Sequence, residues 1–168
     1  LAAIDAGGEA WGWGDVPVII AGEFIGAFIG AVLVWLAYLP HWPETDDPGL
    51  KLAVFSTGPA IRNPGMNLIT EIIGTFMLLF GILALASEAM VVGALGVALL
   101  VVVIGMSLGG PTGYAINPAR DLGPRIMPFV LPIAGKGDSD WGYSWVPVVG
   151  PIIGGVLGAL VGDAVFFQ

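Results

Sequence analysis

The sequence predicts an all-α membrane protein with four membrane-spanning helices and a shorter helix that enters the bilayer without crossing it. The chain of 168 residues is 57% hydrophobic and 11% charged, whereas soluble domains carry about 25% charged residues. Its mean hydropathy is +0.92. Four segments are apolar over the roughly 20 residues that a spanning helix needs. None of them shows the alternation of a barrel strand, so we expect helices.

The four predicted spans belong to a single domain that covers residues 1–168. They are residues 16–39, which contain Glu23; residues 67–86, which contain Glu71; residues 90–108, which carry no charge; and residues 145–167, which contain Asp163. The 27 glycines of the chain fit helices that approach one another closely inside a membrane.

Three connectors join these spans. Residues 40–66 are acidic and rich in proline and glycine, which predicts a solvated loop. Residues 87–89 are short enough for a tight turn between two helices. Residues 109–144 are too polar to span, yet part of this connector is amphipathic. The basic residues all lie in the two long connectors, so the positive-inside rule does not decide the orientation of the chain.

Composition argues against several classes of function. The chain has no cysteine and a single histidine, His41, which lies in a connector, so we expect no disulfide framework and no metal site. The spans contain no histidine, no cysteine and no serine with a base that would support catalysis. The formal charge of −8 argues against a nucleic-acid partner. We therefore expect no enzyme and no cofactor.

An internal repeat is visible when the chain is shifted by 128 residues. Trp13 and Gly14 then coincide with Trp141 and Gly142, and Gly22, Gly26 and Gly30 coincide with Gly150, Gly154 and Gly158. Two glycine-rich helices can match in this way by chance. The alternative is a duplicated fold whose copies face opposite sides of the bilayer, because the second copy is the third span after the first, and successive spans alternate in direction.

The connector 109–144 contains the segment Asn117-Pro118-Ala119-Arg120. Asparagine is a favoured N-cap and proline a favoured first helical residue, so we expect a helix from Pro118 to about Val130. This helix is too short to cross, and its positive end would face a polar path. The irregular lead-in before Asn117 is tolerable at membrane depth only where it is buried or lines a cavity, to which it would expose its carbonyl groups.

Three charged residues are expected to act at or beside this helix, and two interpretations of Arg120 compete. Arg120 costs about 2.5–3.5 kcal/mol at membrane depth and by default marks a pathway. It either donates hydrogen bonds to a passing solute or ties down its own loop, for example by pairing with Asp121. We expect Asp121 to be structural, as an acid in the first turn of a helix. We expect Glu71 to be a scaffold residue that holds the N–H groups of the lead-in.

The segment Asn117-Pro118-Ala119-Arg120 resembles the second signature motif of the aquaporin superfamily, the major intrinsic proteins. The resemblance extends along essentially the whole chain. The predicted spans are similar to the third to sixth helices of that family, and residues 109–144 to its second re-entrant half-helix. Residues 1–15 look like the tail of the first half-helix and the loop after it. The resemblance implies an inverted repeat whose first two helices and first Asn-Pro-Ala motif precede Leu1.

Within the superfamily the chain is similar to the aquaglyceroporins and bacterial glycerol facilitators. Gly105 stands where water channels have histidine, Asp121 follows the arginine, and Pro147-Val148 resembles the Pro-Leu pair of glycerol channels. Tyr114 occupies a selectivity-filter position. Glu23 departs from the family, which usually has glutamine there, and implies a buried acid beside the pore.

The resemblance implies a passive channel for glycerol, other small uncharged polyols and water that excludes ions and protons. The implied pore residues are the filter Arg120, Gly105 and Tyr114, the carbonyls of Gly113, Ala115 and Ile116, and the motif Asn117, Pro118 and Ala119. It also implies a homotetramer in a lipid bilayer, the plasma membrane or bacterial inner membrane. A water-selective aquaporin and a structural membrane protein of the same fold are the alternatives.

Overall fold

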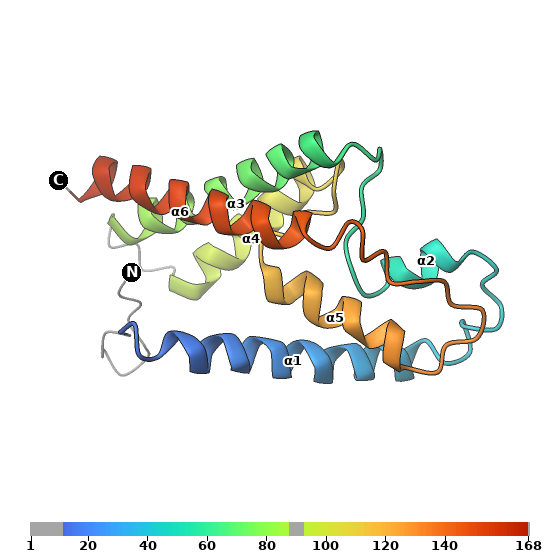
Figure 1. Ribbon diagram of the computed structural model, residues 1–168. Coiled ribbons are helices and arrows are strands. Elements are labelled where there is room, and N and C mark those ends of the chain that lie inside the picture. The colour runs from blue at the N-terminus through green and yellow to red at the C-terminus, as the bar shows by residue number, and fades with distance from the viewer. Residues whose placement is uncertain (1–11, 88–92, 168) are drawn as a thin grey trace.

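The computed structural model describes residues 12–87 and 93–167, and within these ranges the chain is helical and contains no strand (Figure 1). The helices are α1 (Val16–Ala37), α2 (Pro48–Ala53), α3 (Pro64–Ser87), α4 (Gly93–Leu108), α5 (Pro118–Val130) and α6 (Val146–Phe166). The predicted all-α class is confirmed. The expected half-helix tail within residues 1–15 lies mostly outside the described residues.

Three helices of the described chain, α1, α3 and α6, are long and apolar enough to cross a membrane. Their ends lie within three residues of the predicted ends of the spans. The described part of α4 has 16 residues, or about 24 Å at 1.5 Å per residue, which is shorter than a hydrocarbon core of about 30 Å. The predicted start of this span, and most of the predicted turn 87–89, lie outside the described residues.

Helix α6 packs on α3 through glycines that bring the two backbones into contact. A Cβ atom added to Gly154 would lie 2.3 Å from the Ile72 carbonyl oxygen, and one added to Gly158 would lie 2.5 Å from that of Phe76. Residues without a side chain at these positions let membrane helices approach closely and gain dispersion contacts. The glycine ridge of α6 is therefore a packing surface.

Helix α1 packs on α5, and α5 in turn contacts α6, so the short helix connects the two longer ones. At the closest approach of α1 and α5, a Cβ atom on Gly123 would lie 2.8 Å from the Cβ of Ala27. Following the chain in Figure 1, α1 and α6 run in opposite directions. This is the arrangement expected if the two glycine-rich helices are copies in an inverted repeat.

The connector 40–66 differs in part from the solvated loop that we expected. It contains α2, which Asp47 caps by accepting a hydrogen bond from the Gly49 N–H at 2.7 Å. Trp42 stacks on Phe55 with 5.6 Å between ring centroids, and both are buried against the segment that follows α5. Most residues of the connector are exposed, as predicted. The burial of the two aromatic rings was not predicted, because it depends on residues distant in sequence.

Candidate functional site

Helix α5 begins as predicted. Asn117 has extended φ and ψ angles of −154° and 124°, and its side-chain oxygen accepts hydrogen bonds from the N–H groups of Ala119 at 2.8 Å and Arg120 at 3.3 Å. Pro118 is the first residue of the helix, which ends at Val130. Asn117 therefore satisfies two of the N–H groups that every helix start leaves without a partner.

The lead-in to α5 is held by Glu71 of α3, whose side chain is 1% exposed. Glu71 Oε1 accepts from Thr112 Oγ1 at 2.7 Å and from the Ala115 N–H at 3.0 Å, and Oε2 accepts from the Ile116 N–H at 3.0 Å. These are the hydrogen bonds to the lead-in that the sequence analysis expected of Glu71. Hydrogen bonds to a carboxylate are about twice as strong as neutral ones, so they hold the lead-in firmly.

The backbone of the lead-in adopts a conformation that is rare outside glycine. Gly113, Tyr114 and Ile116 have φ angles of 81°, 42° and 47°. A positive φ is a true outlier for a β-branched residue such as Ile116, and strain of this kind gathers at functional sites. Within the described chain, none of the carbonyl oxygens of residues 113–116 accepts a hydrogen bond from the protein. Glu71 thus engages the donors, while four successive acceptors are left for other partners.

The ring of Tyr114 occupies the space beside Gly105. A Cβ atom on Gly105 would lie 2.9 Å from Tyr114 Cζ, and one on Gly109 would lie 2.7 Å from Tyr114 Cδ1. Gly105 lies in α4 and Gly109 directly follows it. Because neither residue has a side chain, there is room for the aromatic ring of Tyr114. Because α4 and the lead-in meet only in the folded chain, the residue type at position 105 does not reveal what occupies the space beside it.

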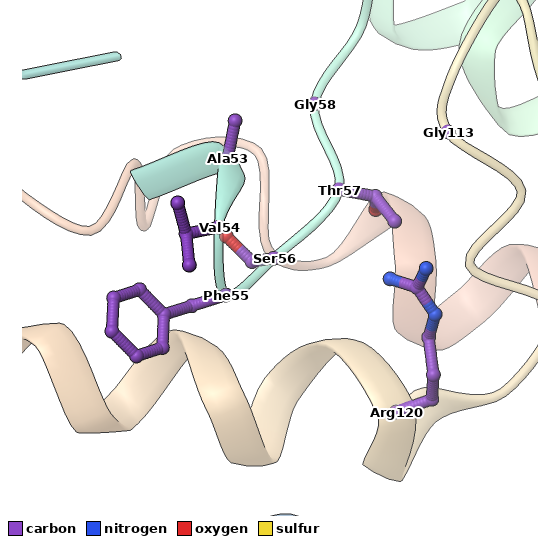
Figure 2. Close-up of a pocket in the computed structure, with 8 residues that line it drawn as sticks. All are labelled: Ala53, Val54, Phe55, Ser56, Thr57, Gly58, Gly113 and Arg120. Carbon is purple, nitrogen blue, oxygen red and sulfur yellow. The ribbon is translucent and has the colours of Figure 1, made fainter. Parts of the chain in front are cut away.

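Arg120 faces a cavity of about 340 Å³, lined also by residues 53–58 and Gly113 (Figure 2). Figure 2 shows its guanidinium group pointing toward Thr57, across from α2 and the segment after it. Its Cζ atom lies 5.5 Å from the centroid of the Tyr114 ring, a cation–π distance. Among the described residues the guanidinium makes no hydrogen bond and no ion pair. The interpretation in which Arg120 pairs with Asp121 is wrong.

Asp121 pairs instead with Arg125, and both side chains are 0% exposed. Arg125 Nε donates to Asp121 Oδ1 at 2.7 Å, and Nη2 donates to Oδ2 at 3.0 Å. Asp121 Oδ2 also accepts from the N–H and the hydroxyl of Thr57, at 2.7 and 2.6 Å. Neither Arg125 nor Thr57 was predicted from the sequence to belong to the site. The i,i+4 spacing of Asp121 and Arg125 on a predicted helix is the signal that would have found the pair.

Tyr143 lies close to Arg125 of this ion pair and to a second arginine, Arg62. The ring of Tyr143 lies between Arg125 and Arg62, whose Cζ atoms are 5.9 and 5.6 Å from its centroid. Arg62 forms an ion pair with Asp140 on the outer side. Burial, followed by the negative charges of Glu71 and Asp121, raises the pKa of the Tyr143 phenol well above its usual value, so the phenol stays neutral at physiological pH.

Two further predicted residues have different surroundings. Glu23 was expected to be a buried acid, but within the described chain it is exposed. Its Oε2 accepts a hydrogen bond from the Asn117 amide at 3.4 Å. Pro147 is buried in the first turn of α6. The described residues include no group of three or more metal-ligating side chains, so within them no candidate metal site is found.

Comparisons with known proteins agree with this architecture. The family model described as "Major intrinsic protein" matches residues 13–162. A "Probable glycerol uptake facilitator protein" of Thermotoga maritima is 61% identical over 141 residues, which is 83% of this chain and 60% of that protein. A "Glycerol uptake facilitator protein" of Bacillus subtilis is 58% identical over 156 residues, 92% of this chain and 57% of that protein.

A solved structure is also similar. The aquaglyceroporin from Plasmodium falciparum has a TM-score of 0.79 and 28% identity, covering 94% of this chain and 66% of that one. The chain thus belongs to the major intrinsic protein family and is a multi-pass integral membrane protein. It spans about 60% of the length of the curated relatives named above. The selectivity roles and the tetramer stay predictions.

Proposed function

We propose that the protein is a passive channel that facilitates the diffusion of glycerol and other small uncharged polyols, together with water, and excludes ions and protons. One observation carries the proposal: the Arg120 guanidinium faces a cavity that Gly113 also lines, where a row of carbonyl groups begins. The donor and the acceptors have no protein partner among the described residues. Relatives more than 50% identical to this chain are named glycerol uptake facilitators, which supports the same solute.

A polyol fits this arrangement because each hydroxyl group both accepts and donates. Its oxygens would accept from Arg120 and its hydroxyl hydrogens would donate to the carbonyls of residues 113–116, while its C–H groups would pass the Tyr114 ring. The positive charge of Arg120 and the positive end of α5 would repel cations and protons. Asn117 would offer its amide hydrogens at the same helix end, where Glu23 now accepts one of them.

The remaining features of the proposal follow from the family. Flow would be driven by the solute gradient alone, because the sequence has no phosphate-binding loop and no relay of intramembrane acids. We infer a homotetramer with one pore per subunit, located in the plasma membrane or bacterial inner membrane. Chemical cross-linking of the purified protein, resolved by denaturing electrophoresis, would test the number of subunits.

Stopped-flow light scattering on liposomes that contain the full-length protein tests the proposed function. After a hyperosmotic step with glycerol, we expect re-swelling much faster than in protein-free liposomes, and no such acceleration with sorbitol. Fast water efflux without glycerol entry would replace the proposal with a water-selective channel. Absence of both fluxes from correctly folded protein would contradict a channel and favour a structural role.

A further inference from the structure

Thr57 lies where three segments of the chain meet, and its side chain is only 7% exposed. Its N–H and hydroxyl groups donate to Asp121 Oδ2, and its carbonyl oxygen accepts from Arg125 Nη2 at 2.6 Å. All three polar groups of Thr57 are therefore bonded to one fully buried ion pair on α5. A residue anchored in this way has almost no freedom to shift relative to that helix.

The apolar side of Thr57 rests against the lead-in. A Cβ atom on Gly113 would lie 3.1 Å from Thr57 Cβ and 3.3 Å from its Cγ2 methyl group. Gly113 has a φ of 81° and contributes the first of the four carbonyl groups without a protein partner. Thr57 thus acts as a spacer between the connector that follows α2 and the lead-in to α5.

Both segments line the cavity that Arg120 faces (Figure 2). The connector contributes residues 53–58, the lead-in contributes Gly113, and α5 contributes Arg120. Asp121, the next residue of α5, is the one that holds Thr57. The Arg120 backbone is therefore tied to the connector through its neighbour Asp121, which binds Thr57.

We propose that Thr57 is a positioning residue that sets the width of the cavity in front of Arg120, and with it the discrimination between glycerol and longer polyols. The discrimination rests on the proposed channel function, whereas the positioning does not. Thr57 itself need not touch solute, because its polar groups are all engaged by Asp121 and Arg125. Losing the hydroxyl removes a hydrogen bond to a charged group, one of the stronger kinds in proteins.

A matched pair of variants separates the hydroxyl from the shape of the side chain. Thr57→Val keeps the branched shape and removes the hydroxyl, and Thr57→Ser keeps the hydroxyl and removes the methyl group. We expect the ratio of glycerol to xylitol permeability in liposomes to fall about threefold or more in Thr57→Val, as the loss of a hydrogen bond to a charged group permits. Thr57→Ser should keep most of the ratio. An unchanged ratio in folded Thr57→Val, or an equal fall in both variants, would overturn the proposal.

A second readout does not require solute flux. Because the chain has no cysteine, a spin label can be attached to a single introduced thiol at Gly58→Cys, where an added Cβ meets no atom of the described residues within 4 Å. We expect the label to become more mobile in the Thr57→Val background and not in Thr57→Ser. A label at Gly14→Cys, which also has open space, is the control and should not respond.

The two readouts separate the two proposals. A protein that conducts no glycerol but shows the expected change in label mobility would refute the channel function and keep Thr57 as a positioning residue. Glycerol conduction with no change of label mobility at position 58 would keep the channel function and refute Thr57 as a positioning residue. If Thr57→Val does not fold, Thr57→Ala takes its place in both measurements, since it removes the hydroxyl without adding bulk.

Discussion

Helices α1 and α6 carry the same glycine pattern, but the pattern has different surroundings in each. In α6 a Cβ atom on Gly150, Gly154 or Gly158 would meet α3 at 2.6 Å or less. In α1 a Cβ atom on Gly22, Gly26 or Gly30 would meet no described atom within 4 Å. Glycines four residues apart therefore show that a helix is able to pack closely, and not which helix packs on it.

The close contact that α1 does make lies on another face. There the small residue on α1 is Ala27, and the glycine that permits the approach is Gly123 of α5. The close contact between α1 and α5 therefore depends on a single glycine of α5, and not on the glycines that recur every fourth residue in α1. Three substitutions test this comparison, and they are ordered by the size of the expected effect.

The largest effect is expected from Gly154→Leu on the α6 ridge. Its Cβ would lie 2.3 Å from the Ile72 carbonyl oxygen, and no change of rotamer relieves a contact between Cβ and backbone. We expect the loss to reach the ~5 kcal/mol that can be the whole stability of a small domain, and therefore no folded protein. Size-exclusion chromatography in detergent and a thermal melt followed by circular dichroism would measure it. A cooperative melt near the wild-type temperature would show that α3 and α6 do not depend on the ridge.

An intermediate effect is expected from Gly123→Ala at the contact of α5 with α1. The added Cβ would lie 2.8 Å from that of Ala27, so the two helices must separate slightly, at about the 1–3 kcal/mol typical of overpacking. Chemical denaturation in detergent micelles would report the loss. A compensating Ala27→Gly should restore part of it, and failure of that rescue would mean that the contact is not the cause.

The smallest effect is expected from Gly26→Ala on the α1 ridge. Open space surrounds the added methyl group, and alanine favours a helix over glycine by about 1 kcal/mol, so the 168-residue chain should be unchanged or slightly more stable. The same denaturation experiment measures it against Gly154→Ala. A loss comparable to that of Gly154→Ala would indicate that residues outside the described ranges pack on the α1 ridge, and the two ridges would then be equivalent.

The sequence by itself determined the features that depend on neighbouring residues. Hydropathy averaged over some 20 residues located α1, α3 and α6. Asn117 and Pro118 predicted where α5 begins, because capping involves only the first three or four residues of a helix. The sequence also predicted the scaffold role of Glu71, whose hydrogen bonds to the lead-in are present.

Only the tertiary structure decided which residues meet across the fold. Thr57 reaches Asp121 across 64 positions of sequence and Arg125 across 68, and no local pattern encodes such a distance. The same holds for the Tyr114 ring in the space beside Gly105 and for the buried aromatic rings of the connector 40–66. Glycine spacing, hydropathy and caps act within one helix, whereas the partner of each surface is chosen by the packing of all helices together.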